Sequence, residues 1–175
     1  MAILHSATIR PTKLELLETV LGGPVEVLGS YRFDDPAGEV GVEAFVVRRG
    51  AQLHHVVLTY RDAPLDVHGA RLVGTMEHSV LGQRWVYDGT TDPVAGDCFR
   101  RALRGEQGQA VLELWEDGRV VGTREPTVRL VAHAQASSDS RTVRILRDLD
   151  DGTAPGPALV ASWTGGQADV ARLDD

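Results

Sequence analysis

The order of hydrophobic and polar residues predicts a short helix near the N-terminus. Thr12 and Glu15 have the Ser/Thr-x-x-Glu spacing of a capping box, and Gly22-Gly23-Pro24 ends the helical pattern. The positions that repeat with helical period are Leu14, Leu17, Val20 and Leu21. Before this helix, residues 2–9 alternate in character, as a strand does.

From Val25 to Tyr87 the pattern changes to period two and is broken by Gly, Pro and Asp. The predicted strands are residues 25–33, 41–48, 53–60, 70–78 and 83–87. Most of their connections are short, although the connection through Pro64 is longer, and short connections favour an antiparallel meander. One face of such a sheet must be covered, and the N-terminal helix is the expected cover.

A second helix is predicted to begin at Asp92-Pro93, an N-cap followed by proline, and to end at Gly105. Its predicted buried side comprises Val94, Cys98, Phe99, Ala102 and Leu103. Glu116-Asp117-Gly118-Arg119 is typical of a hairpin turn, and residues 136–141 have the composition of a linker. The later predicted strands are residues 110–115, 120–123, 127–133, 142–146, 158–163 and 168–173.

The 175 residues suit one compact unit, and the charge balance limits its partners. With 18 Lys and Arg against 25 Asp and Glu, the net charge is −7, and no basic cluster is present that would favour nucleic acid. Cys98 is the only cysteine, so the chain builds neither an intramolecular disulfide nor a thiolate metal site. Because we find no signal peptide and no membrane-spanning stretch, we expect no membrane partner and a cytoplasmic protein.

The histidines and acidic residues give no catalytic or metal-binding constellation. His54 and His55 are neighbours on a predicted strand, so they point to opposite sides and cannot chelate one ion together. The same argument separates Glu77 from His78, and His78 is expected on an apolar face. We therefore predict no metal site.

Three further motifs do not meet the requirements of a reactive thiol, a calcium loop or a phosphate-binding loop. Cys98 lies on the inward side of a helix, where a thiol is inert. The run Asp148-Leu149-Asp150-Asp151-Gly152 lacks the spacing and closing glutamate of a calcium loop, which indicates a solvated turn. Gly22-Gly23-Pro24 has no lysine and follows a helix, unlike a phosphate-binding loop. We expect no cofactor.

Aromatic residues on the sheet leave two alternatives open. Trp85 and Tyr87 share a strand face and, with Tyr60, form either an aromatic platform for a sugar ring or part of the hydrophobic core. By parity, Arg84 lies on the face opposite Trp85.

Several blocks, in order along residues 1–105, resemble the N-terminal cap domain of bacterial maltokinases and related glucosamine kinases. These blocks are Thr8 to Leu17, Leu58 to Arg61, Val73 to Ser79, Leu81 to Gly89 and Thr91 to Val94. The resemblance implies an α+β fold in which a curved antiparallel sheet packs on the N-terminal helix, likened to the cystatin fold. A second helix and additional C-terminal strands complete this expectation.

In the full-length kinases the cap precedes a catalytic module that binds ATP, magnesium and a sugar. This sequence contains no His-Gly-Asp catalytic loop, and the residues after Gly105 are too few for a two-lobed kinase, so we expect no kinase activity. Residues 1–105 are expected to form the cap-like domain. Residues 106–175 are expected to add strands that complete or extend it.

The resemblance suggests a non-catalytic binding or regulatory module that works with a sugar kinase or another protein of carbohydrate metabolism. The candidate contact surface comprises Thr59, Tyr60, Arg61, Glu77, Arg84 and Asp88, which equally well fix turns and strand register. One alternative is a sugar or sugar-phosphate binding protein that uses the concave sheet face. Another is a small enzyme using Glu77, His78 or Asp88. Edge strands also offer a route to a homodimer.

Overall fold

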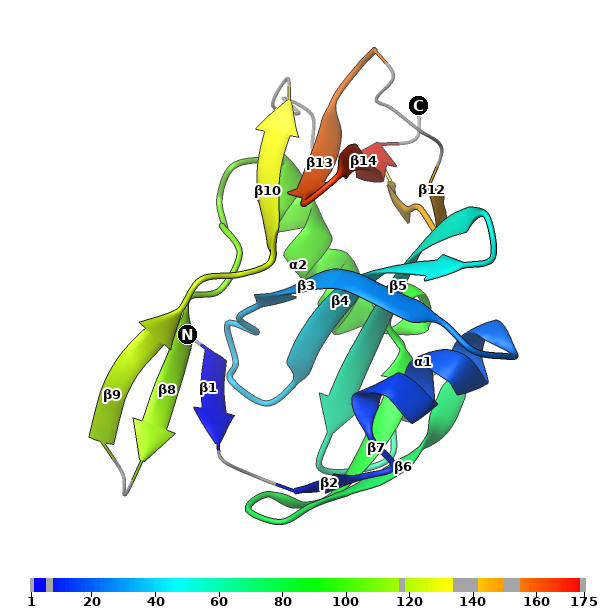
Figure 1. The fold of residues 1–175 in the computed structure, drawn as a ribbon. Coiled ribbons are helices and arrows are strands. Elements are labelled where there is room, and N and C mark those ends of the chain that lie inside the picture. Colours follow the sequence, from blue (N-terminus) through cyan, green and yellow to red (C-terminus); the bar gives the residue numbers. More distant parts are fainter. Residues whose placement is uncertain (1, 6–7, 117–118, 134–141, 150–154, 174–175) are drawn as a thin grey trace.

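The computed structural model describes residues 2–5, 8–116, 119–133, 142–149 and 155–173. Its helical elements are α1 (Lys13–Leu21), the single-turn η1 (Gly89–Thr91) and α2 (Pro93–Leu103). All other regular elements are strands, which form three sheets (Figure 1).

The largest sheet lies at the centre of the molecule and has the order β2-β6-β7-β5-β4-β3. Its strands are β2 (Ile9–Arg10), β3 (Glu26–Phe33), β4 (Gly41–Arg49), β5 (Gln52–Arg61), β6 (Leu72–His78) and β7 (Gly82–Asp88). Every neighbouring pair is antiparallel. A short strand, β12 (Asp148–Leu149), pairs with the first half of β5, and β7 pairs with the second half.

This central sheet is covered on both faces. On one face, α1 buries Leu16 and Leu17 against side chains such as Phe45 and Leu58. On the other face, α2 and the C-terminal strands share a second buried cluster with the sheet. Members of this cluster include Tyr31, Val46, Val57, Phe99, Val128, Leu159 and Val170.

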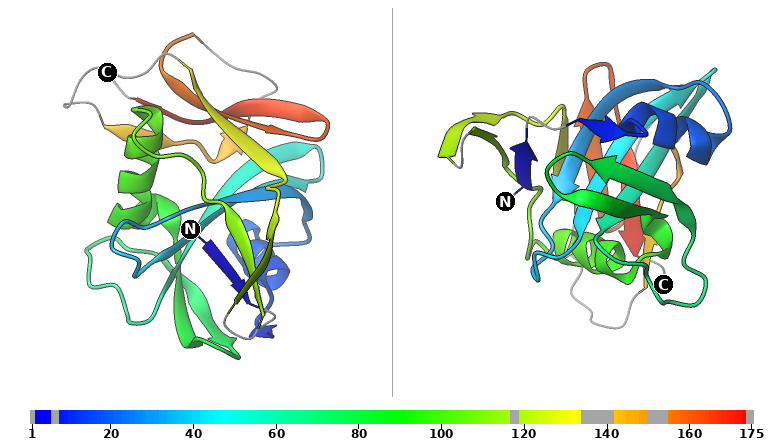
Figure 2. Two further views of the ribbon diagram at one scale, coloured as in Figure 1. Left: turned by 90° about the vertical axis from the view of Figure 1, so that its left-hand side faces the viewer. Right: turned by 90° about the horizontal axis from the view of Figure 1, so that it is seen from below.

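The C-terminal strands form a second sheet of order β10-β13-β14-β11. They are β10 (Val128–His133), β11 (Val143–Ile145), β13 (Ala158–Trp163) and β14 (Gly166–Leu173). The third sheet comprises β1 (Ala2–His5), β8 (Leu112–Glu116) and β9 (Arg119–Arg124), and we call it the arm. Figure 2 shows the arm standing out from the rest of the molecule.

Local sequence signals explain where both helices begin and end. In α1 the capping box forms as predicted: the Glu15 amide donates to Thr12 Oγ1 (3.3 Å), and the Thr12 amide donates to Glu15 Oε2 (2.7 Å). Gly22 ends the helix at a φ of 72°, a conformation that favours glycine. The predicted buried face of α1 is wrong at one position. Leu14 is 45% exposed, and Leu16 is buried in its place.

The predicted fold class is confirmed: α+β, with a curled antiparallel sheet on the N-terminal helix and further C-terminal strands. The simple meander is wrong, because β7 lies between β5 and β6. The long connection through Pro64 carries the chain to the far side before β6 and β7 return as a hairpin. The single strand expected over residues 2–9 is instead divided between the arm and the central sheet. The linker predicted at residues 136–141 lies outside the described residues.

A fully buried tyrosine–histidine pair connects the C-terminal segment to the central sheet. His55 Nδ1 lies 2.9 Å from the Leu146 carbonyl oxygen, and His55 Nε2 lies 2.8 Å from the Tyr31 hydroxyl. Because a carbonyl only accepts, Nδ1 carries the proton, and the Tyr31 hydroxyl donates to Nε2. Burial lowers the pKa of His55 from 6.5 to about 4 despite the hydrogen bond to Leu146.

We expect this histidine to make the protein less stable in mild acid. The folded state holds His55 neutral, so its contribution is complete above pH 6.5 and is lost as the pH falls towards about 4. The loss is on the order of 3 kcal/mol. Urea unfolding of the wild type and His55→Gln across this pH range measures it as the difference between the two proteins. A pH-independent difference would contradict the assignment.

Candidate functional site

The six residues predicted to form a contact surface do not lie on one surface. Thr59, Tyr60 and Asp88 are buried, Arg61 and Arg84 are half-buried, and Glu77 is exposed. The structure brings some of them into separate polar clusters, described below. Their role in binding stays a prediction.

The first cluster surrounds the carboxylate of Asp92, the N-cap of α2. Asp92 Oδ2 accepts hydrogen bonds from Thr59 Oγ1 (2.7 Å) and Arg61 Nε (2.8 Å). Its Oδ1 accepts from Arg61 Nη2 (2.7 Å) and from the amide of Val94 (3.0 Å). Burial alone raises the pKa of Asp92, but these hydrogen bonds outweigh it and the pKa is lowered. The arrangement ties β5 to the start of α2.

The second cluster surrounds Asp88 at the end of β7. Asp88 Oδ1 accepts from the amide (3.1 Å) and the hydroxyl (2.8 Å) of Thr90, which fixes the turn of η1. Arg147 donates to Asp88 Oδ2 and also to Thr90, and Arg71 lies 3.7 Å from the same oxygen. Asp88 therefore connects the turn after β7 to the segment before β12.

The third cluster lies between α1 and the sheet. Glu43 is buried, and its carboxylate lies 2.7 Å from Lys13 Nζ and 3.5 Å from Arg32 Nη2. Tyr60 is nearby, and burial, followed by the negative charge of Glu43, raises the pKa of the Tyr60 hydroxyl. The position of Tyr60 rules out the proposed aromatic platform. Tyr60 pairs with Val86 and packs on the α1 side, so it faces away from Trp85 and Tyr87.

Glu77 and Arg84 lie on the β6–β7 hairpin, whose turn exposes two apolar side chains. Val80 is 56% exposed and Leu81 is 47% exposed. The turn is held by His78 Nδ1, which accepts from the amides of Val80 (3.2 Å) and Leu81 (3.1 Å), and by Arg84 Nη2, which donates to the Leu81 carbonyl (2.9 Å). Sequence reasoning missed this apolar tip, although adjacent valine and leucine before Gly82 at a turn are a readable signal.

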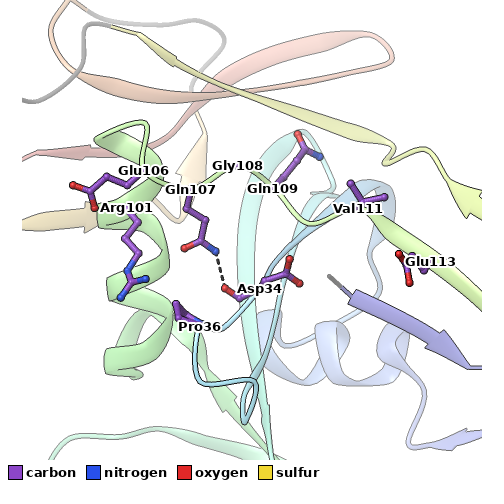
Figure 3. A pocket seen from close by; sticks show the side chains of 9 residues that line it. All are labelled: Asp34, Pro36, Arg101, Glu106, Gln107, Gly108, Gln109, Val111 and Glu113. Atoms are coloured by element: carbon purple, nitrogen blue, oxygen red, sulfur yellow. Dashed lines mark hydrogen bonds between the residues drawn. The ribbon is translucent and has the colours of Figure 1, made fainter.

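A cavity of about 600 Å³ lies at the base of the arm, between the end of α2 and the turn after β3 (Figure 3). Gln107 Nε2 donates to the Asp34 carbonyl (2.7 Å) and connects the two walls. The lining residues are Asp34, Pro36, Arg101, Glu106, Gln107, Gly108, Gln109, Val111 and Glu113.

The remaining sequence motifs, in the part of the chain that the structure describes, provide neither a reactive thiol nor a cluster of metal ligands. Cys98 is buried, and burial raises the pKa of its thiol to about 11, so the nucleophilic thiolate is disfavoured. Across the described ranges, no three His, Cys, Asp or Glu side chains gather where they could hold a metal ion. The solvated turn predicted at Asp148 is wrong for its first two residues, because Asp148 and Leu149 form β12; residues 150–152 lie outside the described residues.

In the part of the chain that the structure describes, neither helix is long and apolar enough to cross a membrane. Its fold and polar clusters define an α+β protein whose buried charged groups pair with one another around a curled sheet.

Part of the chain matches the model of a known protein family. Residues 19–92 match the model of the maltokinase N-terminal cap domain family. These residues include β3 to β7 and end at the N-cap of α2, so the resemblance inferred from the sequence blocks is confirmed over this part. A cap domain is not catalytic by itself. No curated protein and no solved structure gives a significant match to the chain.

Proposed function

We propose that this protein is a non-catalytic, cap-like module that binds or regulates a sugar kinase of maltose, trehalose, glycogen or amino-sugar metabolism. The observation that carries the proposal is the match of residues 19–92 to the maltokinase N-terminal cap domain. In the kinases that contain such a cap, it accompanies a catalytic module, and the proposed partner is a module of that kind.

The polar clusters favour a structural role over a catalytic one. The carboxylates of Asp92, Asp88 and Glu43 are each engaged by arginine or lysine side chains. Such pairs fix the positions of helices and turns, whereas a general acid or base needs an accessible group with a suitably shifted pKa.

The β6–β7 hairpin is the surface that best suits docking of the partner. It belongs to the matched residues, and it presents Val80 and Leu81 beside Glu77 and Arg84. Exposed apolar side chains rimmed by charged ones are typical of protein interaction sites. Because the turn is held by hydrogen bonds, little ordering entropy is lost on binding.

Affinity capture of a sugar kinase from the source organism tests this function. We expect wild-type protein to retain a kinase, and a Val80→Asp/Leu81→Asp variant to retain at least about tenfold less, since a charged tip opposes burial. Val131→Asp is the matched control, because Val131 is 54% exposed but lies on β10, outside the matched residues. Equal capture by all three proteins, or recovery of no kinase, would overturn the proposal.

The alternative of sugar binding on the concave sheet face gains no support from the structure. Both faces of the central sheet are covered by packed side chains, and Tyr60 faces away from Trp85. A thermal-shift screen against sugars and sugar phosphates tests it directly, because a ligand that binds the folded state raises the melting temperature.

A further inference from the structure

Two arginine side chains from distant segments of the chain meet at one oxygen of Asp88. The Asp88 residue is 6% exposed, and its Oδ1 already accepts from the amide and the hydroxyl of Thr90. Both arginines are found at the other oxygen: Arg147 Nη2 donates to Oδ2, and Arg71 Nη1 lies 3.7 Å from it. Two positive charges therefore share one negative charge, which leaves an excess of one positive charge in this cluster.

The carboxylate of Asp97 on α2 also binds two arginines, but in a different arrangement. Its Oδ1 lies 2.7 Å from Arg100 Nη1, and its Oδ2 lies 2.7 Å from Arg101 Nε. Each of these arginines has an oxygen of its own, whereas Arg71 and Arg147 share a single atom. Two guanidinium groups at one atom repel each other, and a further anion between them removes this repulsion.

Arg71 and Arg147 also have hydrogen-bond donors left over, and both side chains reach the solvent. The Arg71 side chain is 68% exposed, and its 3.7 Å contact is longer than a hydrogen bond. The Arg147 side chain is 42% exposed, and its Nη2 donates to Asp88 and Thr90. A guanidinium carries five N–H donors in a planar fork. Most of these donors on the two side chains have no acceptor among the residues that the structure describes.

We infer that a phosphate group binds between Arg71 and Arg147, on the solvent side of Asp88. The planar fork of arginine matches the oxygens of phosphate, and a tetrahedral group accepts from two arginines that approach from different directions. A carboxylate matches less well, because a single fork occupies both of its oxygens. The ligand class is therefore inorganic phosphate or a small phosphate ester. This inference depends neither on the proposed sugar-kinase partner nor on the β6–β7 hairpin.

Isothermal titration calorimetry of the full-length protein at constant ionic strength tests the site. The two probes are sodium phosphate and glycerol phosphate, and the comparison between them separates free phosphate from an ester. We expect saturable binding of at least one probe by the wild type.

Arg71→Gln is the principal variant, because Arg71 makes no short side-chain contact in the described ranges and its loss should leave the fold intact. It removes one charge and one fork, so the dissociation constant of the bound probe should rise at least about tenfold. Arg147→Gln should weaken binding by a similar factor. Because it also removes a hydrogen bond to Asp88, its unfolding in urea is measured alongside.

Arg48→Gln is the matched control. The Arg48 side chain is 47% exposed and lies 2.8 Å from Glu26, so one carboxylate already neutralises it. This variant removes the same charge from the protein and should leave the dissociation constant unchanged. Three outcomes would overturn the inference: no saturable binding of either probe by the wild type, binding that Arg71→Gln leaves unchanged, or equal weakening by Arg48→Gln, which indicates general electrostatic attraction instead of a site.

Discussion

Replacement of Asp92 by alanine is expected to destabilise the protein by about 3–5 kcal/mol, the range for a charged group left buried without its partner. The substitution removes the N-cap of α2, worth about 1 kcal/mol, together with the acceptor for Thr59 and Arg61. Arg61 is largely enclosed, with 17% of its side chain exposed, so water replaces the lost carboxylate poorly. Urea unfolding followed by circular dichroism measures the loss.

Two further variants separate the contributions at this position. Asp92→Asn keeps a capping side chain but removes the charge, and should cost less than the alanine substitution. Asp97→Ala is the matched control, because Asp97 lies on the same helix and pairs with Arg100 and Arg101 at the surface, where ion pairs contribute about 0–1 kcal/mol. If Asp92→Ala cost no more than Asp97→Ala, the network around Asp92 would not be the anchor of α2.

Removal of all residues after Arg104 is expected to abolish cooperative unfolding. Residues 106–175 supply Val128, Leu159 and Val170 to the cluster that covers α2 and one face of the central sheet. The fragment would therefore expose Phe99 and its neighbours to water, and each large apolar side chain exposed costs about 1.5–3 kcal/mol. Differential scanning calorimetry of the fragment and of the full chain provides the measurement.

This truncation also tests whether residues 1–105 form a separate domain. A fragment that melts in one sharp transition would show that residues 1–105 form a domain on their own and that the later strands are an addition. A broad, featureless trace accompanied by dye binding to exposed apolar surface would show that the later strands complete the same domain.

The sequence patterns predicted most elements because their signals are local. The capping box at Thr12 and the N-cap at Asp92 depend on side chains that reach only two or three residues along the chain. Alternation within β3, β4 and β5 places one set of side chains on each face, and these strands agree with the predicted ranges to within one residue.

The arrangement of the strands was less accessible to sequence reasoning. The insertion of β7 between β5 and β6 depends on hydrogen bonds between distant segments, and the two-residue strand β12 is too short to give a periodic pattern. The polar clusters were missed for the same reason. Asp88 and Arg147 meet across the fold, and no spacing in the sequence indicates that they do.

Two contacts described above have a consequence for biosynthesis. They are the hydrogen bond from His55 to the Leu146 carbonyl oxygen and the pairing of β12 with β5. The face of the sheet beneath α2 is finished by residues that are synthesised after the central strands and α2 themselves. Until then the nascent chain carries its apolar helix face without a cover, a situation in which chaperones bind and aggregation competes with folding. Folding of this sheet face is thus completed only once β13 and β14 have been synthesised.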